Sequence, residues 1–284
     1  MSRITILKDL IGYLKESNIS KVYEMFRLLD ETNDIELQKE NNLYLYLLSY
    51  IAEVPDEYII RLSSINHEDL LINSENTRYE EISTQNKIRI NIFRAKFYEV
   101  KEMIEKTTYN MFVNETEREL LLTLVKLANE KEKQTRTQIE SLVKNKGYSD
   151  LISLLEKRKE KRKLNIYETY IYIITTAILR IIKINKIPKV TNQNPSNIKE
   201  AILGYNFKEA LVINKKDIAE KYEDSKYVIN LLLIEINKLI NKVINEYRIK
   251  LENEKKMIMD NINRIKEELS KGNIELSLEL ILDF

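Results

Sequence analysis

The scarcity of chain-breaking residues constrains the fold more than any other feature of this sequence. The 284 residues include only 4 glycines and 3 prolines. Because glycine and proline mark strand ends, hairpins and tight loops, a chain so poor in both has few places to turn and must run in long segments. The sequence therefore predicts an all-α protein, long enough for one elongated domain or two compact ones.

Charge and cysteine content exclude several classes of function. The 46 basic and 45 acidic side chains nearly cancel, so no global field attracts the chain to nucleic acid or to an anionic membrane. The absence of cysteine excludes disulfides, thiolate nucleophiles and thiolate metal sites, and it suits a reducing compartment. The N-terminal segment has Lys8 and Asp9 after a short apolar run, unlike a signal peptide. We therefore expect a cytoplasmic protein.

Apolar residues at three- and four-residue spacing predict helices along nearly the whole chain. The predicted helices cover 2–16, 20–31, 34–53, 55–65, 76–92, 94–108, 115–145, 149–161, 165–184, 196–204, 207–221, 224–270 and 274–282. The most apolar of them contains an uncharged run, 169–179, that is much shorter than the about 20 residues needed to cross a bilayer. It is predicted to be a buried core helix.

Two features organise the predicted helices into regions. The segment 185–197, "NKIPKVTNQNPSN", holds two of the three prolines and many turn-forming side chains. We therefore expect an N-terminal helical-repeat region, 1–187, and a C-terminal long-helix region, 188–284, that continues the same stack. The C-terminal region has an apolar seam from Leu232 to Leu269, which is typical of a coiled coil or of an internal antiparallel bundle. The bundle is favoured, because the heptad spacing skips between Val243 and Ile258. Two shorter helices with a bend near Asn253 are the alternative to one long helix.

Five windows share one pattern where two predicted helices meet. In each window a small or polar residue precedes a large apolar residue. An apolar or small residue follows three places later, and an apolar residue, or in one window Asn214, follows seven places later on the same helix face. The large residues are Ile19, Phe97, Tyr148, Phe207 and Ile274. Three of the four glycines, Gly147, Gly204 and Gly272, lie at or beside these turns. We expect a left-handed residue there to end the first helix of each pair.

The fourth of these windows, "YNFKEALVI", resembles the turn of the tetratricopeptide repeat (TPR) family through Asn206, Phe207 and Ala210. The resemblance implies an irregular right-handed solenoid of antiparallel helix pairs, with long helices toward the C-terminus. By that likeness, a concave helical surface would bind a peptide or protein. The candidate partner-binding residues are polar and aromatic side chains on the predicted helices: Tyr44, Tyr46, Asn86, Arg89, Tyr170 and Asn230.

No residue pattern indicates catalysis, a metal site or a cofactor. The only histidine, His67, follows Arg61 by six residues, a spacing that resembles the active motif of helical HEPN ribonucleases. A histidine in a cap or a loop is the favoured interpretation of so short a pattern. The four glycines are too far apart to form a phosphate-binding loop, and one histidine without cysteine excludes zinc bound by nitrogen and sulfur within one chain.

The sharpest local charge feature is a basic cluster within "EKRKEKRKLN". Its six members are Lys157, Arg158, Lys159, Lys161, Arg162 and Lys163. The cluster suits phosphate groups of nucleic acid or an acidic partner. A solvated helix end is the favoured interpretation, because basic side chains complement the exposed carbonyls there.

Together these features predict a non-enzymatic adaptor or regulatory protein that binds a peptide or protein partner on a helical surface. One alternative is a nucleic-acid-associated protein that uses the basic cluster, and a less favoured one is a HEPN-like ribonuclease. No membrane partner is expected. The long C-terminal helices also allow a homodimer.

Overall fold

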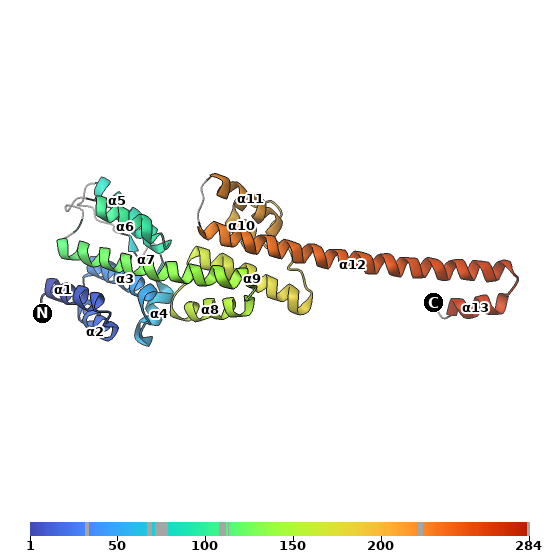
Figure 1. The fold of residues 1–284 in the computed structure, drawn as a ribbon, viewed down its shortest axis with the longest axis horizontal. Helices are drawn as coiled ribbons and strands as arrows, with labels where there is room; N and C mark the ends of the chain where they lie inside the picture. Colours follow the sequence, from blue (N-terminus) through green and yellow to red (C-terminus); the bar gives the residue numbers. More distant parts are fainter. Residues whose placement is uncertain are drawn as a thin grey trace. The chain divides into compact units, whose positions relative to one another are not determined.

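The computed structural model describes residues 1–31, 34–66, 70–71, 79–107, 112, 114–220 and 224–282, and this part of the chain contains helices and connecting turns but no strand (Figure 1). The all-α prediction is confirmed. All thirteen predicted helices are present, and no helix end differs from its predicted position by more than three residues. No helix in the described ranges is long and apolar enough to cross a bilayer.

The chain divides into two compact units. The first comprises Met1–Thr175 with Glu223–Ile229, and the second Thr176–Tyr222 with Asn230–Phe284. The first unit contains α1 (Arg3–Lys15), α2 (Ile19–Asp30), α3 (Ile35–Ile51), α4 (Asp56–Ser64), α5 (Tyr79–Phe93), α6 (Phe97–Lys106), α7 (Glu115–Lys144), α8 (Tyr148–Lys161) and the first half of α9 (Ile166–Ile184). The second contains the rest of α9, α10 (Ile198–Leu203), α11 (Phe207–Glu220), most of α12 (Asp224–Ser270) and α13 (Ile274–Leu282).

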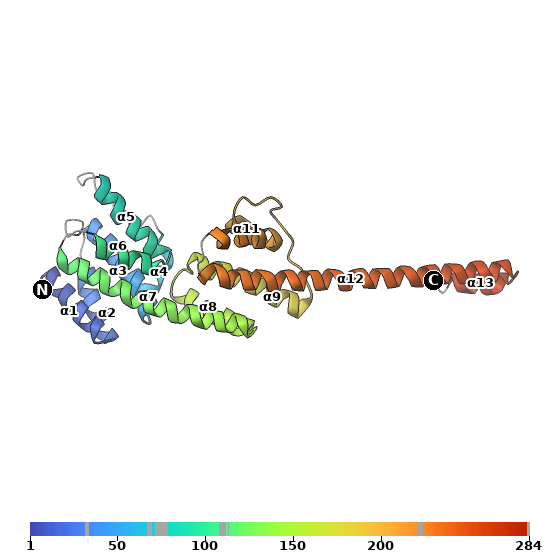
Figure 2. The same ribbon diagram turned by 45° about the horizontal axis from the view of Figure 1, so that its top comes forward.

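Helix α7 organises the first unit. Its 30 residues begin at Glu115, and the preceding Asn114 caps the helix because its side chain accepts a hydrogen bond from the amide of Glu117. The inner face of α7 buries leucine, valine and alanine side chains against α1, α3, α6 and α8 (Figures 1 and 2). Because α1 and α3 are distant from α7 in sequence, long-range contacts as well as contacts between neighbouring helices hold the core of this unit.

The five windows with the shared pattern are five copies of one turn. Each turn joins consecutive helices: α1 to α2, α5 to α6, α7 to α8, α10 to α11 and α12 to α13. The residue two places before the large apolar one has positive φ, between 55° and 80°, and these residues are Ser17, Ala95, Lys146, Tyr205 and Gly272. The amide of the next residue donates to the carbonyl five residues earlier, at 2.8 to 3.0 Å in all five turns. This hydrogen-bond pattern is the Schellman motif. The expectation of a left-handed residue at each turn is confirmed.

The large apolar residue of the turn is buried where a core is available. Phe97 and Phe207 are each 1% exposed, and Tyr148 is buried as well. Ile274 occupies the same position between α12 and α13 but is 64% exposed. The turn therefore forms by local backbone hydrogen bonding, and burial of its apolar residue depends on what surrounds the helix pair.

The role expected for two of the glycines is wrong. Gly204 and Gly147 have negative φ, and the left-handed residues are their neighbours Tyr205 and Lys146. Gly204 is needed because the segment before α10 lies against it. The amide of Thr191 donates to the Gly204 carbonyl at 2.9 Å, and a Cβ on Gly204 would lie 2.8 Å from the Cβ of Asn192.

Replacing Gly204 by alanine should therefore lower the free energy of unfolding by about 1–3 kcal/mol, the usual cost of overpacking. Gly12 provides a matched control, since it lies inside α1 and a Cβ there would meet no atom within 4 Å. Gly12→Ala should instead stabilise by about 0.5–1 kcal/mol, because alanine is the better helix former. Urea unfolding followed by circular dichroism measures both changes. Equal effects of the two substitutions would contradict this role for Gly204.

Helix α12 is one continuous helix of 47 residues, which corresponds to a length of about 70 Å. In the second unit its N-terminal part lies beside α10 and α11 (Figures 1 and 2), where Asn237 donates a 2.9 Å hydrogen bond to the carbonyl of Phe207. Leu232, Leu233 and Ile236 are fully buried there. The rest of α12 continues beyond α11, and α13 turns back beside its C-terminal end.

Candidate protein-binding surface

The six side chains predicted to bind a partner do not form one exposed surface. Tyr44, Tyr46, Arg89 and Tyr170 are buried in the first unit. Asn86, in the first unit, and Asn230, in the second, are half-buried. Two of the buried members, Tyr46 and Arg89, have hydrogen-bond partners inside the protein. The Tyr46 hydroxyl, for example, donates to the carbonyl of Phe93 at 3.2 Å.

Arg89 lies beside a small polar cavity of about 30 Å³. Its guanidinium donates to Glu40 and, at 3.0 Å, to the carbonyl of Leu70. Glu117 also lines the cavity and accepts a hydrogen bond from Arg3 at 3.2 Å. Burial raises the pKa of Glu117, and the charge of Arg3 opposes this rise only in part. A space of this size holds about one water molecule and no larger ligand.

The basic cluster is divided between the protein surface and the interior. Lys157, Lys159 and Lys163 are exposed, and Lys161 is half-buried and pairs with Glu53 at 2.8 Å. The two arginines of the cluster, Arg158 and Arg162, instead turn inward, and Arg162 is only 2% exposed. The cluster is therefore not one continuous cationic surface.

Arg162 is held by a fully buried carboxylate, Glu168. Two parallel hydrogen bonds of 2.9 and 3.0 Å join the guanidinium to the two carboxylate oxygens, and Arg158 approaches the same carboxylate at 2.6 Å. Arg158 also reaches Glu132 of α7 at 3.2 Å. The Arg162 guanidinium lies over the ring of Tyr50, 3.8 Å from its centroid. These contacts connect α3, α7, α8 and α9.

The local sequence explains why Glu168 is buried and ionised. Asn165 caps α9, and the two residues form a capping box in which each side chain accepts a 2.9 Å hydrogen bond from the other's amide. Burial alone would raise the pKa of Glu168, but the charges of Arg162 and Arg158 and the hydrogen bonds outweigh it, so its pKa lies below the ordinary value. Because every carboxylate oxygen is already paired with a cation, the cluster supports structure rather than proton transfer.

The HEPN-like pattern cannot be assembled from the described residues, because His67 lies outside them. Arg61, its predicted companion, donates to Asn42 at 2.7 Å and pairs with Asp30. No group of three or more histidine, aspartate and glutamate side chains in the described ranges is arranged to hold a metal ion.

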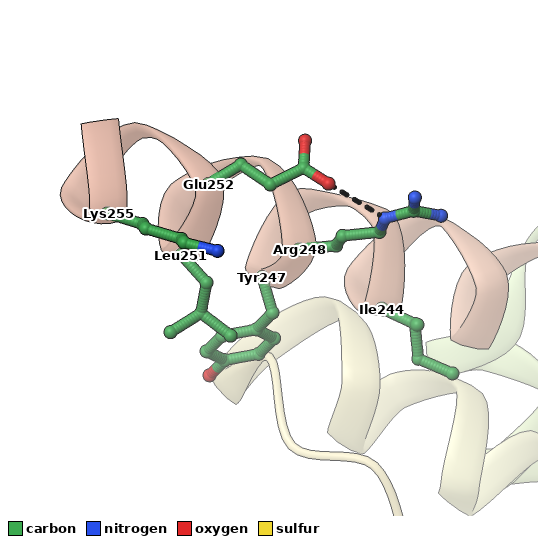
Figure 3. Close-up of a pocket in the computed structure, with 6 residues that line it drawn as sticks. All are labelled: Ile244, Tyr247, Arg248, Leu251, Glu252 and Lys255. Carbon is green, nitrogen blue, oxygen red and sulfur yellow. Dashed lines mark hydrogen bonds and ion pairs between the residues drawn. The ribbon is translucent and has the colours of Figure 1, made fainter. Parts of the chain in front are cut away.

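A row of exposed, large apolar side chains lies along one face of α12. It consists of Ile244, Tyr247, Leu251 and Ile258, hereafter the α12 stripe. Tyr247 is 55% exposed and Leu251 63% exposed, and the other two are about half exposed. Figure 3 shows that Ile244, Tyr247 and Leu251 point to the same side of the helix and, with Arg248, Glu252 and Lys255, line a shallow depression. Arg248 and Glu252 form an ion pair at 3.1 Å.

The α12 stripe continues the buried face of the same helix. Ile236 and Val243, which lie on that face closer to the N-terminus, are buried, and exposure begins at Ile244. Beyond the stripe, Ile262 and Ile265 are half-buried. The side chains of the α12 stripe are therefore chemically suited to burial, yet they are exposed in the part of the chain that the structure describes.

The sequence seam from Leu232 to Leu269 already contained Tyr247, Leu251 and Ile258, but they were not predicted as site residues. Periodicity shows which side of a helix is apolar. It does not show whether the covering element belongs to the same chain. Comparison with models of known protein families, with curated proteins and with solved structures finds no match to this chain.

Proposed function

We propose that this chain is a non-enzymatic adaptor or regulatory protein, and that it binds a helix of another protein chain along the α12 stripe. The observation that carries the proposal is the exposure of four large apolar side chains in line with a face that is buried at Ile236 and Val243 before them and half-buried at Ile262 and Ile265 after them. A helix laid along such a stripe would bury side chains at three- and four-residue spacing. Isolated exposed apolar residues are common on protein surfaces, but an aligned row marks an interaction site.

The spacing of the stripe fits a helical partner. Tyr247 and Ile258 are 11 residues apart, as are Leu251 and Ile262, and Ile258 and Leu269. Eleven residues in three turns give 3.67 residues per turn, close to the 3.6 of a straight helix. The apolar row therefore runs almost parallel to the helix axis, so a second helix could remain in contact with it over several turns.

A TPR-like arrangement of helix pairs remains part of this proposal. Five turns with one backbone conformation support it, since a repeated helix–turn–helix unit is the basis of such proteins. The partner surface proposed here is not the concave one expected from the resemblance. We place it on α12, because four of the six residues proposed for the concave surface are buried.

The nucleic-acid alternative has less support. Two of the six members of the basic cluster are committed to buried carboxylates, and two more, Lys161 and Lys163, contact Glu53 and Asn66. No observation on the described residues favours the ribonuclease alternative.

Photo-cross-linking in cells of the native host tests the proposed surface. A benzoylphenylalanine at Leu251 should form an adduct with a defined protein, identified by mass spectrometry. The matched control is the same probe at Ile249, which is 57% exposed but lies on the opposite side of the helix. Adducts of equal yield at both positions, or at neither, would contradict the proposal.

A further inference from the structure

We infer that the partner on the α12 stripe is a second copy of this chain, with the two α12–α13 hairpins overlapping in opposite directions. This inference rests on the proposed function, because it names the occupant of the same surface. Three observations carry it: a second exposed apolar row on α13, the length of the hairpin and the distribution of charge along it.

Helix α13 leaves apolar side chains uncovered, as the α12 stripe does. Its small residue Ser277 is buried, whereas Ile274, Leu276 and Leu278 are exposed. Ile274 and Leu278 are four residues apart and therefore share a face. The hairpin thus has one apolar row on each of its two helices, and two such hairpins can bury these rows against one another as a four-helix arrangement.

The hairpin is long enough for stable pairing. From Ile244 to Ser270, α12 spans about 40 Å at 1.5 Å per residue. An overlap of this length is nearly four heptads, which is within the range in which paired helices become stable.

Charge selects the direction of the second copy. The base of the hairpin, residues 240–256, contains five basic and three acidic residues. The tip, residues 257–282, contains three basic and five acidic residues. In an antiparallel pair each acidic tip lies along the basic base of the other copy, whereas a parallel pair would place like charges together. The depression is lined by Arg248, Lys255 and one acidic residue, Glu252, so it carries a net positive charge where the opposite tip would lie (Figure 3).

The pairing also explains why the tip ends in an acidic helix. The charged residues of α13 are Glu275 and Glu279, with no basic residue among its nine. In the antiparallel arrangement, α13 of one copy faces the base of the other, beside Arg248 and Lys255. Apolar contact then supplies most of the affinity, and charge fixes the direction.

Sedimentation equilibrium of the full chain tests the inference. The wild type is expected to form a dimer at micromolar concentration. Leu251→Glu should raise the dissociation constant at least 100-fold, because two charges would be buried per dimer. Ile249→Glu, the same change on the opposite side of α12, should change it less than threefold. A wild type that stays monomeric at 0.1 mM or above, or a dimer that survives Leu251→Glu, would overturn the inference.

A charge exchange tests the direction. The pair Arg248→Glu and Lys255→Glu makes the base acidic, and the pair Glu275→Lys and Glu279→Lys makes the tip basic. Each pair alone should weaken the dimer at least tenfold at low salt, and the two pairs combined should restore it. Failure of the combined variant to recover would exclude the antiparallel direction. A monomeric wild type that still cross-links through Leu251 to a different protein would overturn only the inference and leave the proposed function standing.

Discussion

Replacing Glu168 by glutamine is expected to lower the free energy of unfolding by about 3–5 kcal/mol, the usual cost of removing one partner of a buried ion pair. Glu168 is fully buried and is the only carboxylate bound by Arg162 among the residues that the structure describes. Without its charge, the Arg162 guanidinium would remain buried with no counterion. Urea unfolding of wild type and variant, followed by circular dichroism, measures the loss.

Two further variants test whether this effect comes from the buried ion pair. Glu160 lies on α8 near the same cluster but is exposed, so Glu160→Gln should change the unfolding free energy by less than about 0.5 kcal/mol. Removing both charges with Arg162→Met and Glu168→Leu should recover much of the loss, because no unpaired ion then remains. If Glu168→Gln cost no more than Glu160→Gln, the buried ion cluster would not have the structural role described here.

The decrease in unfolding free energy caused by Glu168→Gln should also depend on pH. The pKa of Glu168 is lower in the folded protein than its ordinary value of about 4.3, so its stabilising effect is fully present above that pH. As the pH falls through the folded pKa, the carboxylate is protonated and the effect is lost. The difference in unfolding free energy between wild type and Glu168→Gln should therefore be constant near pH 7 and should become smaller below about pH 4.

Truncating Phe97 to alanine is expected to cost about 3–5 kcal/mol, comparable to the effect at Glu168. Phe97 is 1% exposed and meets Tyr50 edge to face, with the ring centroids 4.9 Å apart. Its neighbour Tyr98 is the matched control, since it is an aromatic residue on the same helix but 61% exposed. Tyr98→Ala should cost less than about 1 kcal/mol. Similar losses at the two positions would show that the turn residue does not anchor α6 in the core.

The helices and their turns could be predicted from sequence because both depend on local rules. The 3.6-residue spacing of apolar side chains gave the thirteen helices, and α12 is continuous although the heptad spacing skips inside it. The turn between α10 and α11 shows where such local rules are not sufficient. A glycine near a helix end suggests positive φ, but Gly204 is there because Asn192 approaches it, and that contact joins residues more than ten positions apart.

The inward direction of Arg158 and Arg162 could not be predicted from the charge run itself. A dense run of six basic residues indicates a solvated surface, and three of the four lysines in the cluster are indeed exposed. A signal was nevertheless present at Asn165 and Glu168, whose spacing is that of a capping box at the start of the most apolar helix. A carboxylate at the start of so apolar a helix needs a cation where it is buried, and Lys163 and Arg162 are the two nearest in sequence. Sequence distance alone does not show that Arg162 is the one that pairs with it.

Distances between spin labels test directly whether a second copy covers the α12 stripe. The chain has no cysteine, so single cysteines at Asn245, Met257 and Lys271 can each be spin-labelled in an otherwise unchanged protein. Pulsed dipolar spectroscopy then measures the distance between equivalent labels. Antiparallel pairing centred near residue 257 predicts a short distance at Met257 and about 40 Å at the other two sites, from 1.5 Å per residue. Short distances at all three sites, or no dipolar coupling at any of them, would contradict it.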